Sequence, residues 1–249
     1  MIFPVSHFDQ RIGSRALIPP APLHDVESAS PSHEKEFTVR SLSAPRVVAV
    51  NAQRRFVRKR DFPIVCVGGS AGGLDAYIRL LQSLPADMGV AIVIVNHLRQ
   101  VATFLHEILP KYTKMPVKLI TEGLEITPNH VFIIPEQRDL HVLKGKFELK
   151  PISKPRGWPD VITVFLQSLT RYWEGKVIAV IVSGYDGDGA EALCGIKDIG
   201  GVTIAQKLET AEHPDMPESA INSGCIDFVL SPEAIGCKIV EIAEVVREI

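Results

Sequence analysis

Short apolar runs rich in β-branched residues recur along residues 62–249 and alternate with stretches of helical periodicity. Apolar runs of this length, bounded by glycine, proline or polar residues, are typical of buried strands. Alternation of strands and helices makes successive strands parallel and puts helices on both faces of the sheet. We therefore predict a doubly wound α/β fold with a mainly parallel sheet flanked by helices.

The elements of this fold can be assigned by residue range. The expected strands are 63–68, 90–96, 116–120, 130–135, 176–184, 202–206 and 225–230. Alternation around Lys144-Gly145 predicts one antiparallel hairpin over 140–150. The expected helices are 74–84, 101–109, 160–173, 189–199 and 232–248. Leu74 is expected on the apolar face of the first helix, and Ser231 and Pro232 are expected to cap and begin the last.

Residues 1–60 have a different composition from the rest of the chain. They are rich in proline and serine, carry more basic than acidic residues, and end in the run RRFVRKR at 54–60. Such a composition predicts a disordered leader before a folded domain at 61–249. The basic run is expected to be a solvated linker, and a contact with an acidic partner is the alternative.

Charge and hydropathy exclude several classes of protein. The net charge of −2 gives no general attraction to nucleic acid, and aliphatic runs of six residues are too short to insert into a membrane. The N-terminus lacks the basic start of a secretory signal, so a cytoplasmic location is expected. None of the four cysteines forms a CxxC pair, and we expect all four to be reduced core thiols.

Three chemically active residue types follow expected strands. Ser70 comes after 63–68, His97 after 90–96, and Asp186 and Asp188 after 176–184. The carboxyl ends of parallel strands share one edge of a sheet, so these side chains are expected near one another. Histidine activates a serine hydroxyl by taking its proton, and a carboxylate orients the imidazole. By position alone, either aspartate can take that role.

Ser70 lies in Gly-Gly-Ser-Ala-Gly-Gly, which matches the G-x-S-x-G turn between a strand and a helix. Gly69, Ala71 and Gly72 are expected to bring backbone N–H groups to the substrate and to a developing oxyanion. A helix-capping serine and a phosphate-binding loop are the alternatives, although the lysine of a P-loop is absent. The Asp-Gly-Asp-Gly string hints at calcium but lacks the remaining EF-hand ligands, so no metal site and no cofactor are predicted. The other histidines, His213 among them, show no partner of this kind.

Taken together, the motifs resemble the catalytic domain of CheB-type protein-glutamate methylesterases. The similarity rests on VCVGGSAGGLDA (65–76), VIVNH (93–97), VFIIP (131–135), VIVSGYDGDGAEAL (180–193), TIAQ (203–206) and MPESAINSG (216–224). The resemblance implies a serine esterase with Ser70 as nucleophile, His97 as base and Asp188 as orienting carboxylate. It also implies an oxyanion contact from the backbone near Tyr185, where the family has methionine.

The substrate implied by this resemblance is a glutamate methyl ester on the cytoplasmic helical bundle of a chemoreceptor. Hydrolysis would release methanol, and many relatives also deamidate receptor glutamines. Family members usually carry a phospho-receiver domain, which residues 1–60 are too short to supply, so we expect a stand-alone esterase domain. Two alternatives remain, namely a non-catalytic scaffold of a chemosensory system and an esterase for another substrate.

Overall fold

The computed structural model describes residues 62–96, 104–154 and 159–248. The leader predicted at 1–60 lies outside these residues. His97 and the first residues of the helix predicted at 101–109 also lie outside them. Within the described residues, the strands form a seven-stranded sheet and a separate two-stranded sheet.

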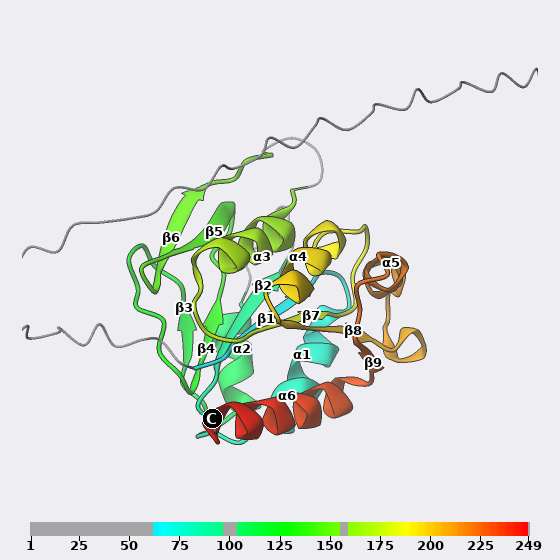
Figure 1. Ribbon diagram of the computed structural model, residues 1–249, viewed down its shortest axis with the longest axis horizontal. Coiled ribbons are helices and arrows are strands. Elements are labelled where there is room, and N and C mark those ends of the chain that lie inside the picture. The colour runs from blue at the N-terminus through cyan, green and yellow to red at the C-terminus, as the bar shows by residue number, and fades with distance from the viewer. Residues whose placement is uncertain (1–61, 97–103, 155–158, 249) are drawn as a thin grey trace, which may run out of the picture. The chain divides into compact units, whose positions relative to one another are not determined.

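The large sheet is parallel and has the order β3-β4-β2-β1-β7-β8-β9. Its strands are β1 (Ile64–Gly69), β2 (Ala91–Asn96), β3 (Val117–Leu119), β4 (His130–Ile133), β7 (Val177–Ile181), β8 (Val202–Gln206) and β9 (Phe228–Leu230). From the central β1 the chain builds one half of the sheet, then crosses back to build the other half from β7 outward (Figure 1). This confirms the predicted doubly wound fold, in which the strand order reverses between β1 and β7.

Alternation along β1 explains why both faces of the sheet are covered. Ile64 and Cys66 point to one face, while Val65 and Val67 point to the other, and each pair belongs to a separate hydrophobic core. All four side chains are buried, which stabilises the fold by about 1.5–3 kcal/mol for each aliphatic residue. A strand that is buried on both faces therefore reads as a continuous apolar run.

Helices cover the two faces in separate groups (Figure 1). The helices on the Val65 face are α1 (Gly73–Gln82), α2 (Leu105–Ile108) and α6 (Pro232–Arg247), and those on the Ile64 face are α3 (Val161–Tyr172), α4 (Leu193–Asp198) and α5 (Asp215–Asn222). Helix α6 begins as predicted, because the Ser231 hydroxyl accepts a hydrogen bond from the Ala234 N–H.

The predicted hairpin is confirmed as β5 (Arg138–Leu143) and β6 (Lys146–Pro151). Lys144 and Gly145 both have positive φ, as a two-residue turn that matches the twist of the strands requires. The hairpin packs on α3, where the Ser168 hydroxyl accepts a hydrogen bond of 2.8 Å from the Val142 N–H.

Two helix predictions need correction, and one helix was missed. Leu74 is 39% exposed, because the buried stripe of α1 is centred on Ala76, Tyr77 and Leu80 and leaves Leu74 at its border. The helix predicted at 189–199 is a 3₁₀ turn over Ala190–Ala192 followed by the short α4. Helix α5 was not predicted, because its eight residues include a proline and carry no long apolar stripe.

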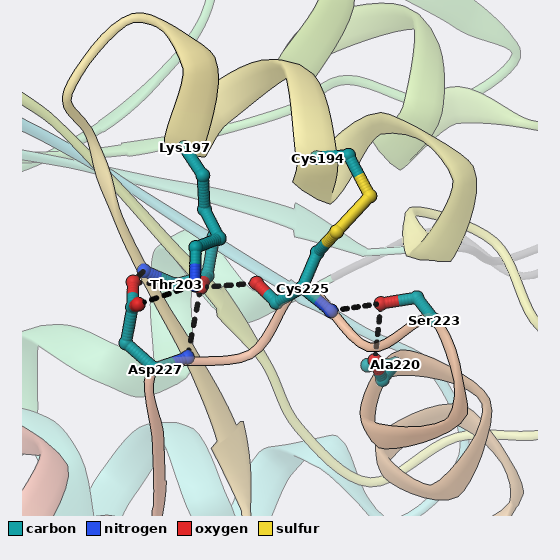
Figure 2. The surroundings of a disulfide bond; sticks show 7 residues. All are labelled: Cys194, Lys197, Thr203, Ala220, Ser223, Cys225 and Asp227. Carbon is teal, nitrogen blue, oxygen red and sulfur yellow. Dashed lines mark hydrogen bonds and ion pairs between the residues drawn. A yellow bond between two sulfur atoms is a disulfide. The ribbon is translucent and has the colours of Figure 1, made fainter.

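The prediction that all four cysteines are reduced core thiols is wrong. Cys194 of α4 forms a disulfide with Cys225, which lies between α5 and β9, with 5.1 Å between their Cα atoms (Figure 2). Cys237 is a free thiol but is exposed, so only Cys66 is both free and buried. Sequence spacing did not indicate the pair because the fold, not the local sequence, brings α4 beside the start of β9.

Candidate active site

Ligand sites in doubly wound sheets form beyond the strand ends where the strand order reverses. In this chain Ser70 directly follows β1, and residues 183–188 follow β7. The Ser70 N–H donates a hydrogen bond of 2.9 Å to the Ser183 carbonyl. The predicted serine and the predicted acidic segment therefore meet at this point of the sheet.

Ser70 lies in a sharp turn that leads into α1. Its carbonyl accepts a hydrogen bond from the N–H of Gly73, the first residue of the helix, so the positive end of α1 lies beside the serine. Gly72 has a φ of 70°, and a Cβ atom there would lie 2.6 Å from both the Ser183 hydroxyl and the Glu212 Cβ. Only glycine fits this position, which explains the glycine after Ser70-Ala71.

Gly184 brings the segment after β7 against Ser70. A Cβ atom at Gly184 would lie 2.9 Å from the Ser70 Cβ and would overlap the Met216 sulfur. The Gly184 N–H donates to the His213 carbonyl, and the Gly184 carbonyl accepts from the Met216 N–H, both at 3.0 Å. Met216 of α5 therefore packs against Gly184, in the segment that contacts Ser70.

Ser183 is fully buried and connects three strand–helix junctions. Its hydroxyl donates to the Ala71 carbonyl and accepts from the His213 N–H, both at 2.9 Å. Its N–H donates to the side-chain oxygen of Gln206, at the end of β8. The segments after β1, β7 and β8 are thus held by one buried side chain.

Asp188 is buried at the beginning of α3. Its two carboxylate oxygens accept hydrogen bonds of 2.9 Å from the N–H groups of Ile162 and Thr163. A helix N-terminus stabilises a negative charge in this position. Burial raises the pKa of the Cys66 thiol, and the negative charge of the nearby Asp188 raises it further.

Asp186 has a different local role. Its φ is 69°, and its side chain accepts a hydrogen bond of 2.9 Å from the Asp188 N–H, two residues further along. This is the local side-chain turn that aspartate commonly forms. The structure therefore distinguishes the two aspartates that the sequence pattern alone left equal, since Asp186 shapes the loop and Asp188 caps a helix.

His97 lies outside the described residues, whereas Asn96 directly before it lies within them. Asn96 ends β2 and is in register with Gly69 of the adjacent β1. The buried Tyr77 hydroxyl donates to the Asn96 side-chain oxygen at 3.4 Å, and burial raises the pKa of Tyr77, which keeps the phenol neutral. The chain thus leaves β2 beside the strand that carries Ser70.

The residues predicted to contact an oxyanion differ in their surroundings. Within the described part of the chain, the backbone N–H groups of Ala71, Gly72 and Tyr185 donate no hydrogen bond. Gly69 instead ends β1, is buried, and packs against the Tyr77 hydroxyl and Val182. The N–H groups of Ala71, Gly72 and Tyr185 are therefore not taken up by other described residues, whereas Gly69 gives the turn its close packing.

The surroundings of His213 were not predictable from the sequence. Its ring lies 4.2 Å from the ring of Tyr185, centroid to centroid, and its Nε2 lies 3.5 Å from a carboxylate oxygen of Glu212. No sequence signal connects Tyr185 with His213, because they belong to different strand–helix junctions. The two meet only when β7 and β8 pair.

Among residues 62–96, 104–154 and 159–248, no group of three or more metal-ligating side chains lies together. None of the helices in these same ranges has the length and apolar character needed to cross a membrane.

Comparison with known proteins agrees with this geometry. Residues 65–239 match the family model described as CheB methylesterase. The chain belongs to the CheB methylesterase family. This membership confirms the predicted α/β catalytic domain and the predicted hydrolase class.

Individual CheB relatives support the same assignment. The chain is 31% identical over 223 residues to protein-glutamate methylesterase/protein-glutamine glutaminase 3 of Pseudomonas savastanoi pv. phaseolicola, covering 87% of this chain and 66% of that protein. It is 33% identical to a protein of the same activity name from Mesorhizobium japonicum, covering 73% of this chain and 54% of that one. This CheB family member thus spans about half to two thirds of the length of these relatives.

A solved CheB structure has the same fold. The crystal structure of the Thermotoga maritima CheB methylesterase catalytic domain superposes with a TM-score of 0.65 at 29% identity. The match covers 73% of this chain and 99% of the Thermotoga domain. The described sheet and its flanking helices are therefore the CheB catalytic fold.

Proposed function

We propose that this chain hydrolyses glutamate methyl esters on the cytoplasmic helical bundle of chemoreceptors and releases methanol. Ser70 is the nucleophile, His97 the general base and then acid, and Asp188 the carboxylate that orients His97. The observation that carries the proposal is the meeting of Ser70 with the segment that bears Asp188, at the reversal point of a CheB fold.

The reaction follows from serine esterase chemistry. Ser70 Oγ attacks the ester carbonyl carbon while His97 accepts the hydroxyl proton, and the oxyanion forms beside the N–H groups of Ala71, Gly72 and Tyr185. The carbon–oxygen bond to methoxide then breaks, and His97 protonates the leaving group to give methanol. Water, deprotonated by His97, attacks the acyl-enzyme, which restores Ser70 and frees a glutamate carboxylate. The same steps at a glutamine amide would release ammonia.

The location of Asp188 supports its proposed role. A carboxylate that orients an imidazole must be fixed in place and must stay ionised. Two backbone N–H groups at the start of α3 hold the Asp188 carboxylate in place through both of its oxygens. Asp186, whose side chain holds the loop, serves the site indirectly.

The test of the proposal is methanol release from membranes that contain methylated chemoreceptors, with the purified full chain and a Ser70→Ala variant. We expect release by the wild type and a loss of about 10⁴-fold or more in the variant, because triad members act as a unit. Release that persists in Ser70→Ala would contradict the mechanism. No release by the wild type would contradict the proposed substrate.

A non-catalytic scaffold and an esterase for another substrate are the competing functions. A fluorophosphonate probe labels an activated serine, so labelling of Ser70 argues against the scaffold. Labelling without methanol release argues for another ester. A chemoreceptor substrate also implies a cytoplasmic location, which localisation of the tagged chain in fractionated cells tests.

A further inference from the structure

An aromatic ledge lies beside the nucleophile, and the mechanism proposed above does not use it. The ledge consists of the Tyr185 and His213 rings, 4.2 Å apart and inclined at 35°. Tyr185 is 48% exposed, and the His213 side chain is 26% exposed. The two rings come from the segments that follow β7 and β8.

Backbone contacts fix the ledge relative to Ser70. The Gly184 N–H donates to the His213 carbonyl, and the backbone at Gly184 lies against the Ser70 Cβ. The His213 N–H donates to the Ser183 hydroxyl, which itself donates to the Ala71 carbonyl. Tyr185 is therefore one residue from the point where the segment after β7 touches the nucleophile.

The His213 ring is held on two sides. Tyr185 packs on one side, while the Glu212 carboxylate lies 3.5 Å from Nε2. The Glu212 side chain in turn packs against Gly72, in the turn that carries Ser70. The His213 ring thus contacts both side chains, and the tyrosine that it packs against keeps nearly half of its surface exposed.

An exposed tyrosine with a fixed ring is well suited to bind a macromolecule. It offers a large amphipathic surface and loses little conformational entropy on binding. Aromatic residues of this kind supply much of the energy of protein–protein contacts. A small ester fits at Ser70 without reaching such a surface, whereas an ester carried on a polypeptide brings neighbouring residues against it.

We infer that Tyr185 is a specificity-determining residue that contacts the polypeptide surface beside the esterified side chain, and that His213 positions it. This inference rests on the proposed function, because it describes how the same site recognises a protein substrate. It assigns the ledge to selection of the substrate and leaves the chemistry to the triad.

The experiment compares two substrates with the full chain. One is the methylated cytoplasmic fragment of a chemoreceptor, and the other is p-nitrophenyl acetate, a small activated ester. The measured quantity is the ratio of kcat/KM for the receptor fragment to kcat/KM for p-nitrophenyl acetate. Tyr185→Ala removes the ring but keeps the backbone N–H that the mechanism assigns to the oxyanion. We expect it to lower this ratio about tenfold, mainly through KM for the receptor fragment.

Matched variants separate the ledge from general effects. Tyr172 at the end of α3 is 46% exposed, so Tyr172→Ala removes an equally exposed ring and should leave the ratio unchanged. His213→Ala should lower the ratio, whereas His213→Phe keeps the ring packing and should restore it. Thermal unfolding checks that each variant is folded.

The outcomes are distinguishable. A ratio in Tyr185→Ala that falls less than about threefold overturns the inference, as does an equal fall in Tyr172→Ala. A loss shared equally by both substrates also overturns it, because the Tyr185 side chain would then act on the chemistry. If the wild type releases no methanol from the receptor fragment, the proposed function fails and this inference fails with it.

Discussion

At the centre of the sheet, buried side chains hold the segments after β1 and β7, whereas a disulfide and an ion pair hold the corner formed by α4, β8 and β9. The central contacts are those of Ser183 and Asp188, which are 0% and 7% exposed. At the corner, Cys194 is exposed, and Asp227 accepts hydrogen bonds from Lys197 and Thr203 (Figure 2).

The central contacts of Ser183 and Asp188 lie where they can position the site, whereas the corner contacts lie where they can stabilise the domain. A buried polar group that loses its partner is costly, and near Ser70 the resulting shift also moves reacting groups. The corner contacts join α4 to the start of β9, and within the described residues they involve neither Ser70 nor Asp188. We therefore expect central variants to lose activity and corner variants to lose stability.

The largest expected effect is that of Asp188→Asn. The amide cannot accept both helix N–H groups as a carboxylate does, and it cannot stabilise a charged imidazole, so kcat should fall by about 10³–10⁴-fold. Asp186→Asn is the matched control, because asparagine tolerates the left-handed φ and can still accept from the Asp188 N–H. Steady-state methanol release measures both, and equal losses would contradict the assignment.

The second prediction tests the junction at Ser183. Ser183→Ala leaves the His213 N–H and the Ala71 carbonyl without their shared partner and should destabilise the fold by about 1–3 kcal/mol. We expect kcat/KM to fall about tenfold as well, because the turn that carries Ser70 loosens.

Ser168→Ala is its matched control. That hydroxyl is also buried, but it accepts from the Val142 N–H where the hairpin meets α3, away from the site. Urea unfolding should show that Ser168→Ala loses about as much stability as Ser183→Ala, and kinetic assays should show that its kcat/KM is unchanged. An equal loss of kcat/KM in both variants would remove the distinction between the centre and the rest of the domain.

The third prediction concerns the corner. Replacing both Cys194 and Cys225 by serine should lower the free energy of unfolding by about 2–4 kcal/mol, because the bond closes a loop of 31 residues. Activity should stay within about twofold of the wild type. Dithiothreitol should reduce the stability of the wild type to that of the variant and leave the variant unchanged.

Counting thiols tests the bond itself. Alkylation of the denatured, non-reduced chain should modify two cysteines, Cys66 and Cys237, and mass spectrometry measures this directly. Four modified cysteines would instead support the reduced thiols predicted from the sequence.

The smallest expected effect is that of Asp227→Asn. Partial burial opposes ionisation of Asp227, but hydrogen bonds from Lys197 and Thr203 outweigh it and lower the pKa of the carboxyl. A lowered pKa stabilises the fold above the ordinary aspartate pKa of about 4, and this contribution is lost as the pH falls through the folded pKa. Chemical unfolding should show wild type more stable than the variant by about 1 kcal/mol at pH 7, and the difference should shrink below pH 4. A stability difference that stays constant with pH would contradict the role assigned to the Asp227 carboxylate.

The sequence predicted the sheet well because its strands are buried on both faces and read as unbroken apolar runs. Ser70 and the acidic loop were also predictable, since chemistry at strand ends follows from parallel topology. Contacts between distant segments were not predictable, and the Cys194–Cys225 bond and the Tyr185–His213 pair are both of this kind. The spacing of residues along the sequence does not indicate which loops come into contact once β7, β8 and β9 are paired.

The pairing of β1 with β7 also determines when during synthesis the site can form. Ile64 pairs with Val177, and the Ser70 turn is hydrogen-bonded to Ser183, so the two halves of the site are more than one hundred residues apart in the chain. Contacts of such long range form late, because the intervening chain must first be ordered. A nascent chain on the ribosome therefore carries the proposed nucleophile, Ser70, through more than one hundred further residues of synthesis before the site can form. On the proposed mechanism, hydrolytic activity arises only once β7 has emerged and paired.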